Sequence, residues 1–381
     1  MAALFAARGV KCTILTTPVN AAVIRSAVDR ANDGADAPPI DLAVVPFPDV
    51  GLPPGVESGP ALNTQEDRDK FFHAARQLRE PFDRFLEASR PDAVVADSFF
   101  DWSAEAAAMF ARACNDSMLR HDPVGSAPDD PDAVVALPGL PHRVELRRSQ
   151  MMDPKKRPEH WAFFQRMNAA DQRSFGELFN SFHELEPDKD VAIRGAEELS
   201  PDADGCLGWL DAKPVGSVVY VSFGTLASFS PAELRRGRII RGWAPQMLIL
   251  NHPAVGGFVT HCGWNSTLEA VSASVPMVTW PRYADQFFNE KLVVELLKVG
   301  VGVGSADYAS KVETRRVIAG EVVAEAIGKV MGDGEEAEAI REKARELGEK
   351  ARGAVEKGGS SYDDVGRLVD ELMARRSSVN V

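Results

Sequence analysis

Cysteine, basic charge and long apolar runs are all scarce in this sequence, and each scarcity excludes a class of protein. The four cysteines among 381 residues form no C-x-x-C pair, so we interpret them as reduced thiols and expect neither a disulfide framework nor a metal site. No apolar run approaches the length of a membrane span, and no basic segment precedes the short apolar run at the N-terminus. These absences argue against a membrane-spanning protein and a signal peptide, and we expect a cytoplasmic protein.

Acidic residues outnumber basic ones, 56 to 43, which gives a net charge of −13. Binding to the phosphate backbone of nucleic acids needs a basic face, so we exclude nucleic acids as partners. A small anion held by backbone amides is still compatible with this charge. The length favours two or three domains, and 45% hydrophobic residues are enough for sizeable cores.

The most informative stretch is residues 243–286. Residues 258–260 have the pattern of the end of a buried strand, a glycine turn follows, and residues 265–270 have the pattern of a helix start. A strand, a glycine turn and a helix start together leave backbone N–H groups that point at an anion. The spacing of Ser266 and Glu269 also fits a capping box, which would fix a helix start and nothing more. These few residues leave both interpretations open.

The motifs of this stretch resemble the signature box of plant UDP-dependent glycosyltransferases. Trp-Ala-Pro-Gln opens it, Phe-x-Thr-His-Cys-Gly-Trp-Asn-Ser-x-x-Glu forms the turn and helix, and Val-Pro-Met, Trp-Pro and Asp-Gln follow at the family's spacing. The resemblance covers nearly all of the chain. It implies an α/β fold of the glycosyltransferase B type, in which two Rossmann-like domains face each other across a cleft.

The resemblance implies roles for residues that would hold the nucleoside of a UDP-sugar donor. Trp243 would stack on uracil, and Ala244 would bond the base through its backbone. Gln246 and Glu269 would hold the ribose hydroxyl groups. Two further positions at which the family touches the nucleotide are Ser222 and Thr225.

The same resemblance assigns the pyrophosphate of the donor to the glycine turn. His261, Asn265 and Ser266 would hold the pyrophosphate, and Trp264 would lie beside them. Gly224, which follows a predicted strand, would allow a close approach of the backbone.

The end of the box would bind the sugar. Asp285 and Gln286 would bond the sugar hydroxyl groups, and Gln at the last position is found in the family more often with glucose than with galactose donors. Asp285 would also fit as the N-cap of a helix that begins at Gln286. The box departs from the family at Ser274, where the family usually has Gly. If this position requires a positive φ, Ser274 weakens folding rather than chemistry.

The N-terminal part departs further from the family. The chain begins with the end of a helix that Gly9 would cap, followed by a strand, so the family's first strand and its catalytic His have no counterpart. No His precedes His73. A predicted buried strand, residues 91–96, ends at Asp97, which matches the family's Asp that hydrogen-bonds the catalytic His. Asp97 would equally fit as a cap of the next helix.

We expect three domain-level segments, with internal gaps relative to the family. Residues 1–200 would form an incomplete acceptor-binding domain, 201–360 the UDP-sugar-binding domain, and 361–381 a C-terminal helix that packs back on the first domain. An amphipathic helix is predicted over residues 67–88. Segments of the family lack counterparts in three internal places, within residues 103–119, before the linker at 201–205, and near Arg235.

The function that the resemblance implies is inverting transfer of glucose from UDP-glucose, as co-substrate, to a hydroxyl group of a small plant metabolite. No further cofactor or metal is implied, and we expect a monomer. Aromatic residues in the first half of the chain favour an apolar acceptor such as a flavonoid or another phenol. The missing His keeps a second hypothesis open, a UDP-sugar-binding protein with impaired catalysis or a defective gene model, because a general base contributes roughly 10²–10⁴-fold in rate.

Overall fold

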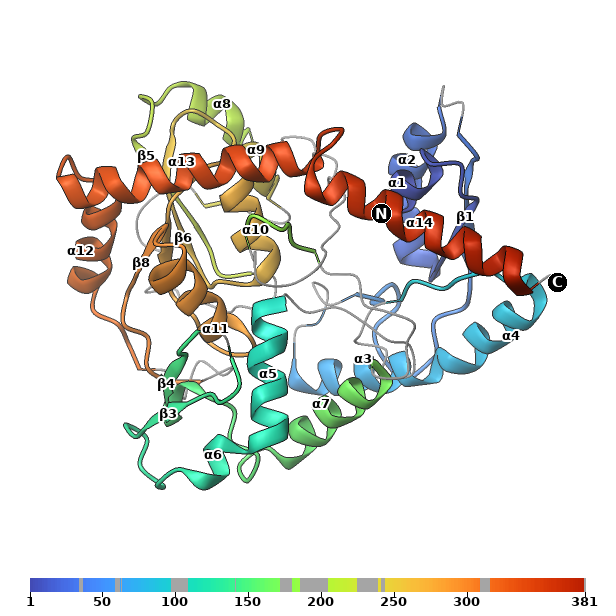
Figure 1. Ribbon diagram of the computed structural model, residues 1–381, viewed down its shortest axis with the longest axis horizontal. Helices are drawn as coiled ribbons and strands as arrows, with labels where there is room; N and C mark the ends of the chain where they lie inside the picture. The colour runs from blue at the N-terminus through green and yellow to red at the C-terminus, as the bar shows by residue number, and fades with distance from the viewer. Residues whose placement is uncertain are drawn as a thin grey trace.

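A computed structural model describes residues 1–33, 37–58, 62, 64–96, 109–140, 142–171, 180–185, 205–224, 239–240, 244–308 and 316–379. Two parallel sheets, each flanked by helices, form the two halves of the molecule (Figure 1). In the described residues no helix is both long and apolar enough to cross a membrane.

The first half contains a β-α-β unit. Strands β1 (Cys12–Thr16) and β2 (Ile40–Val44) pair in parallel, and α2 (Pro18–Asn32) connects them. Helix α1 (Ala2–Ala6) precedes β1 and ends at Gly9, whose φ is +81° and whose N–H donates to Ala6 O at 2.8 Å. This geometry confirms the predicted glycine cap, since a left-handed residue there terminates a helix.

Two predictions in the first half are wrong. The helix predicted over residues 67–88 is divided at Leu78 into α3 (Gln65–Gln77) and α4 (Arg79–Ser89). Pro81 explains the break, because its ring cannot accept a straight helix against the carbonyl four residues earlier. The predicted strand over 91–96 is not a strand and is largely exposed. In the described residues the first sheet contains β1 and β2 alone, so this apolar segment has no neighbouring strand to bury it.

The second half contains a sheet of four parallel strands in the order β5-β6-β7-β8. Their bounds are Val218–Ser222, Val255–Thr260, Met277–Thr279 and Gly300–Gly302. Neighbouring residues point to opposite faces of such strands. Phe258 therefore packs under α10 and α13, and Val259 packs under α12. Both faces of the sheet are buried, as the apolar sequence of β6 predicts.

Helices surround the strands of the second half, and two of them begin where the sequence predicts, just after the glycine turn and at Gln286. The helices are α8 (Cys206–Asp211), α9 (Gln246–Leu250), α10 (Trp264–Ser272), α11 (Gln286–Lys291) with a π-helical turn at Leu292–Leu296, α12 (Gly320–Met331) and α13 (Glu335–Val355). Helix α14 (Ser360–Val379) then runs from α13 across to the first half (Figure 1). There Val365 and Val369 pack against Phe5.

A helical and hairpin segment joins the halves. Helices α5 (Met109–His121), α6 (Pro123–Ser126) and α7 (Pro158–Asp171) surround an antiparallel hairpin of β3 (Val134–Ala136) and β4 (Glu145–Arg147), followed by a 3-10 turn at Arg148–Gln150. The hairpin was not predicted from the sequence. Its apolar face and α5 share one core with Phe287 and Phe288 of α11, so this segment is fixed to the second half.

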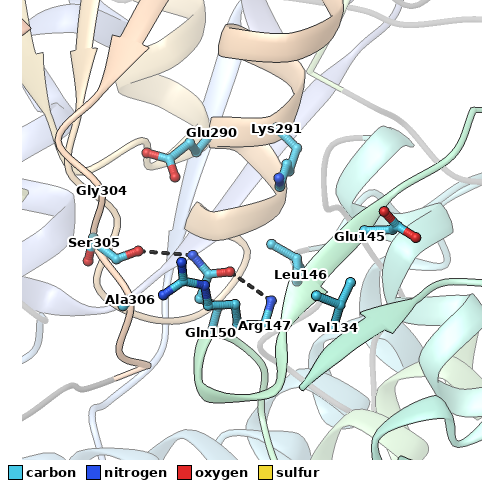
Figure 2. Close-up of a pocket in the computed structure, with 10 residues that line it drawn as sticks. All are labelled: Val134, Glu145, Leu146, Arg147, Gln150, Glu290, Lys291, Gly304, Ser305 and Ala306. Carbon is cyan, nitrogen blue, oxygen red and sulfur yellow. Dashed lines mark hydrogen bonds between the residues drawn. The ribbon is translucent and has the colours of Figure 1, made fainter. Parts of the chain in front are cut away.

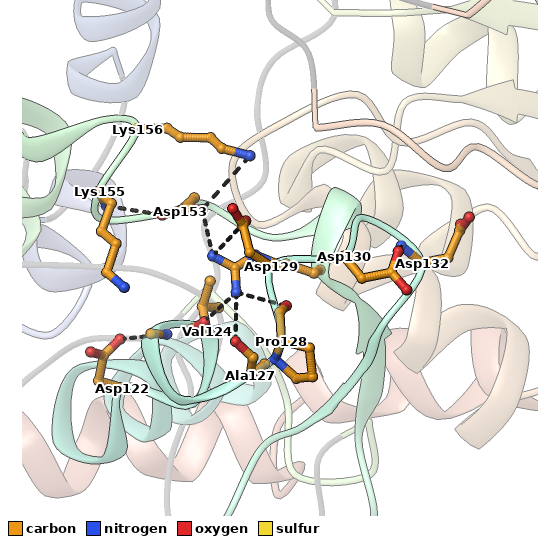
Figure 3. Close-up of polar contacts among 12 residues, drawn as sticks. Asp122, Val124, Ala127, Pro128, Asp129, Asp130, Asp132, Asp153, Lys155 and Lys156 are labelled. Atoms are coloured by element: carbon orange, nitrogen blue, oxygen red, sulfur yellow. Dashed lines mark hydrogen bonds and ion pairs between the residues drawn. The ribbon is translucent and has the colours of Figure 1, made fainter.

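Buried Arg148 ties the hairpin to α6 and the loop after it, where Figure 3 labels its partners Val124, Ala127 and Pro128. Its guanidinium donates to Asp153 Oδ2 at 2.9 Å and to the carbonyl oxygens of Val124, Ala127 and Pro128 at 2.8, 3.0 and 3.0 Å. Burial acts to raise the pKa of Asp153, but its hydrogen bonds, led by the one from Arg148, lower that pKa overall. A charge-assisted network of this kind fixes the loop geometry.

Candidate functional site

Most of the residues predicted to bind a donor meet at one edge of the second sheet. Ser222 ends β5, Thr260 ends β6 and Thr279 ends β7, and the chain turns into α10 and α11 just beyond the last two. The carboxyl edge of a parallel sheet is where α/β proteins bind ligands. The site therefore lies where the fold class places it.

His261 is held between two glycines at this edge. A Cβ atom at Gly224 or at Gly263 would lie 2.6 or 2.4 Å from His261 Nε2, which is too close for any other residue without movement. Gly224 also has φ +77°, a conformation that glycine adopts without steric strain. Burial lowers the pKa of His261 to about 4, an effect that a nearby backbone group of Ser222 only partly offsets. The imidazole is thus neutral at neutral pH.

The start of α10 is not a capping box. Gly263 is the N-cap, and no side chain caps the helix. Ser266 Oγ and Glu269 Oε2 instead accept hydrogen bonds from Gln246 Nε2, at 3.0 and 2.7 Å. The first backbone N–H groups of an α-helix lack an acceptor within the helix, and at the start of α10 no side chain caps them. This leaves the anion-binding interpretation of the turn.

Tyr220, which the sequence did not single out, orients Gln246. Its hydroxyl donates to Gln246 Oε1 at 3.2 Å, and its ring stacks on Phe258 with centroids 5.1 Å apart. Burial raises the pKa of Tyr220 to about 12, so it stays a donor. With its oxygen fixed in this way, Gln246 presents its NH₂ group to Ser266 and Glu269. The alternating pattern of β5 predicts that Tyr220 lies on this face of the sheet. It does not predict that Gln246 is its hydrogen-bond partner.

Asp285 does not cap α11 as one interpretation predicted. Its backbone is already helical, so its side chain has no capping geometry, and Asp285 Oδ2 accepts from Asn289 Nδ2 at 2.9 Å. Asn289 Nδ2 also donates to Cys262 O at 2.8 Å. Burial raises the pKa of Asp285. Asn289, which the sequence also did not single out, thus joins the predicted sugar end to the glycine turn.

Gln286 is buried beside it. Its Oε1 accepts from the backbone N–H groups of Arg282 and Tyr283 at 2.9 and 3.1 Å. These bonds fix which end of the carboxamide faces the turn before α11.

Strained backbone marks the same region. Cys262 and Ala284 have φ +61° and +57°, values that side chains other than glycine rarely adopt. Strained residues of this kind persist where the surrounding structure holds them, and they concentrate at binding sites. Ser274, at the far end of α10, has φ +62°, which confirms the prediction that this position suits glycine.

Trp264 is used for packing between segments. Its indole N–H donates to Asn180 O at 2.6 Å, and its ring packs against the cores on both sides of α10. Ala244 is partly buried, and its carbonyl accepts from Gln246 N at 2.8 Å. The predicted residues Asp97, Thr225 and Trp243 lie outside the described residues. No group of His, Cys, Asp and Glu suited to a metal occurs in the part of the chain that the structure describes.

A separate pocket of about 380 Å³ opens between the β3–β4 hairpin and the second sheet (Figure 2). Gln150 Nε2 donates to Ser305 O at 2.9 Å across its floor. Glu290 lines it and accepts from Thr279 Oγ1, and burial raises the pKa of Glu290 to about 7. No residue predicted to hold the donor lines this pocket.

The two parallel sheets, with a glycine turn and a helix start at the carboxyl edge of the second, define an α/β protein of the glycosyltransferase B type. The solved structure of UGT73P12 from Glycyrrhiza uralensis, complexed with glycyrrhetinic acid 3-O-monoglucuronide, superposes with a TM-score of 0.88. It is 31% identical, and the match covers 100% of this chain and 93% of that one. Residues 216–314 match the model of the UDP-glucoronosyl and UDP-glucosyl transferase family.

Curated relatives agree with this match over almost the whole chain. Scopoletin glucosyltransferase from Nicotiana tabacum is 36% identical over 460 positions, covering 99% of this chain and 95% of the relative. Anthocyanin 3'-O-beta-glucosyltransferase from Gentiana triflora is 36% identical over 459 positions, covering 98% and 94%. The chain belongs to this family, as a plant UDP-dependent glycosyltransferase.

The alignment also tests the predicted gaps. It runs over 460 positions, whereas the chain has 381 residues, so at least 79 positions face no residue of this chain. This confirms that the chain is shorter than its relative within the aligned region.

Proposed function

We propose that this protein transfers glucose from UDP-glucose to a hydroxyl group of a small apolar plant metabolite, a flavonoid or a similar phenol, with inversion. The names of the two curated relatives, which act on scopoletin and on an anthocyanin, support this acceptor class. In this proposal residues 1–200 bind the acceptor, 201–360 bind the donor, and 361–381 pack back on the acceptor domain. The protein acts as a cytoplasmic monomer.

The observation that carries the proposal is the bonded group of Gln246, Ser266 and Glu269 at the start of α10. Gln246 Nε2 donates to both side chains and orients the Glu269 carboxylate, and in this proposal that carboxylate accepts from the ribose hydroxyl groups. Carboxylate oxygens accept strongly from hydroxyl groups, and both side chains are already fixed, so little rotational entropy is lost on binding. Trp243 stacks on uracil, and the backbone of Ala244 bonds the base.

The pyrophosphate binds at the turn before α10. Asn265, Ser266 and the first backbone N–H groups of the helix donate to it, and the helix dipole favours its charge. Neutral His261 contributes a ring N–H rather than a positive charge. The same groups stabilise the charge that develops on departing UDP, which is the electrostatic contribution to catalysis. Two further nucleotide contacts come from Ser222 and Thr225.

The glucose binds near Asp285 and Gln286. The bond from Asn289 fixes the Asp285 carboxylate as a hydrogen-bond acceptor for sugar hydroxyl groups. The Gln286 carboxamide is oriented by two backbone N–H groups. A preference for UDP-glucose over UDP-galactose is expected from Gln286.

Deprotonation of the acceptor is the step for which a second candidate function exists. Asp97 would orient a catalytic His, yet no His precedes His73 in this chain. The second candidate is a UDP-sugar-binding protein whose transfer is slow. The rate without a general base would fall by roughly 10²–10⁴-fold.

The test measures donor binding and transfer separately. Calorimetry with UDP is expected to show binding that Glu269→Ala and Trp243→Ala each weaken by about tenfold, the effect of one lost hydrogen-bonded or stacked contact. Glu335→Ala, in the first turn of α13, is the matched carboxylate control and is expected to bind UDP normally. Absence of UDP binding by folded protein contradicts the donor site. Binding without a β-linked glucoside from UDP-glucose and a flavonol selects the second candidate.

A further inference from the structure

A short segment that precedes the second sheet is built into the donor side of the molecule. In residues 180–185, Phe182 and Leu185 are 4% and 2% exposed and belong to the same core as Phe258 and Leu268. Glu184 Oε2 accepts from Ser360 Oγ at 2.9 Å. These anchors fix the backbone of the segment, so the position of Asn180 at its start is determined by packing rather than by a loose loop.

Asn180 touches the first two residues of α10. Its carbonyl oxygen accepts from Trp264 Nε1 at 2.6 Å, and its side-chain Nδ2 donates to Asn265 Oδ1 at 3.2 Å. Asn180 Oδ1 is buried and has no hydrogen-bond partner among the described residues. A buried unpaired acceptor is unfavourable, so its retention requires an explanation.

The bond to Asn265 decides which end of its carboxamide faces the anion site. A carboxamide has a donor end and an acceptor end, and the terminal torsion of Asn is broad, so an exposed Asn rotates between both orientations. The NH₂ end attracts a pyrophosphate oxygen, and the oxygen end repels it. Because Asn180 occupies Asn265 Oδ1, the NH₂ group is directed away from Asn180 and stays available at the helix start.

We propose that Asn180 is a positioning residue for the donor, which fixes the Asn265 carboxamide with its NH₂ group toward the pyrophosphate. The inference rests on the proposed pyrophosphate role of Asn265. It adds a residue outside the signature box to the donor site, 85 positions earlier in the chain. The first half of the chain thereby influences donor affinity without touching the donor.

The experiment is a double-mutant cycle with two ligands. UDP and uridine binding are measured by calorimetry for Asn180→Ala, Asn265→Ala and the double variant, because uridine lacks the pyrophosphate and reports only that the base and ribose site is folded. Asn180→Ala is expected to weaken UDP binding by about fivefold to tenfold, the effect of one hydrogen bond. Uridine affinity is expected to stay unchanged, and the double variant is expected to bind UDP as Asn265→Ala does.

Two further variants make the result specific. Asn180→Ser keeps a hydroxyl donor and is expected to lose less UDP affinity than Asn180→Ala. Asn251→Ala removes an exposed amide that donates to Met247 O within its own helical turn, and it is expected to leave both affinities unchanged.

The outcomes separate the two levels of the proposal. If Asn265→Ala leaves UDP affinity unchanged, the pyrophosphate role of Asn265 is wrong, and the positioning role fails with it. If Asn265→Ala weakens UDP binding but Asn180→Ala does not, the positioning role alone is wrong. The positioning role is also wrong if Asn180→Ala weakens UDP and uridine binding equally, or if the effects of the two substitutions on UDP affinity add in the double variant. Either result indicates a general structural effect.

Discussion

Replacing Ser274 by glycine should stabilise this protein. Ser274 follows α10 with φ +62°, a left-handed conformation in which a Cβ atom meets the neighbouring carbonyl oxygen. Its Oγ accepts from Arg352 Nη1 at 3.1 Å, but the same nitrogen also donates to Ser272 O at 2.8 Å. Removing the hydroxyl therefore leaves the guanidinium with a partner.

The size of the effect follows from two opposing contributions. The left-handed conformation costs a residue with a side chain about 1–2 kcal/mol. Glycine also makes the unfolded chain more flexible, which lowers the free energy of unfolding by about 0.4–1 kcal/mol. We expect Ser274→Gly to raise the free energy of unfolding by about 0.5–1 kcal/mol, as the difference between these contributions.

Gly348 of α13 provides an independent check of the same geometry. A Cβ atom at Gly348 would lie 2.0 Å from Ser274 Oγ and 2.9 Å from Val271 O. Gly348→Ala should therefore destabilise by about 1–3 kcal/mol, as overpacking does. Part of this loss should disappear in the Ser274→Gly background, because the nearest clashing atom is gone.

The assay is urea unfolding at equilibrium, with the midpoint and slope compared between variants. Ala273→Gly is the matched control, since Ala273 is the adjacent residue but has φ −81°. It should destabilise by about 0.5–1 kcal/mol, the opposite sign. UDP affinity should not change in either variant, because both positions lie at the far end of α10 from the glycine turn. A Ser274→Gly variant that is destabilised like the control would refute the reasoning.

Three other variants test the site and the pocket. Gly263→Ala should lower UDP affinity by about tenfold with the fold intact, since its Cβ would lie 2.4 Å from the His261 ring; calorimetry with normal binding would contradict the packing. Tyr220→Phe should lower UDP affinity about threefold to fivefold by releasing Gln246, a typical effect of one neutral hydrogen bond, and an unchanged affinity would show that Tyr220 only packs. The third variant is Glu290→Gln. Burial raises the pKa of Glu290 from 4.5 to about 7, so the folded state holds a proton that the unfolded state has lost. The free energy of unfolding should therefore fall as the pH rises from the lower to the higher of these two pKa values, by up to about 3 kcal/mol. Between these two pKa values, the urea midpoint of Glu290→Gln should depend less on pH than the midpoint of the unchanged protein. If both midpoints change equally with pH, Glu290 is not the source of the pH dependence.

Local sequence patterns, each of a few consecutive residues, were enough to predict much of the fold. The glycine cap at Gly9 and the starts of α10 and α11 were predicted closely, because caps and helical periodicity act over one or two turns. Two misses also had local signals. Pro81 indicates the break at Leu78, and the turn around Gly139, which has φ +75°, indicates the β3–β4 hairpin.

Within the site, sequence determined which side chains stand at the carboxyl edge, because each follows a strand or opens a helix of recognisable pattern. It did not determine their bonds. Ser266 and Glu269 have capping-box spacing, yet both accept from Gln246, about twenty residues earlier. A local pattern gives spacing along one helix, and the competing partner arrives from α9 only when the sheet is assembled.

The sequence by itself thus determined the family, the strand, glycine turn and helix start of residues 258–270, and which side chains stand at the carboxyl edge of the second sheet. Tertiary structure alone decided that Tyr220 fixes Gln246, that Asn289 joins Asp285 to the glycine turn, and that Asn180 bonds Asn265. The physical reason is the separation along the chain over which each kind of interaction acts. Backbone propensity and capping act between near neighbours in the chain, whereas the direction of a buried amide is chosen by groups that only folding brings within 3 Å or so.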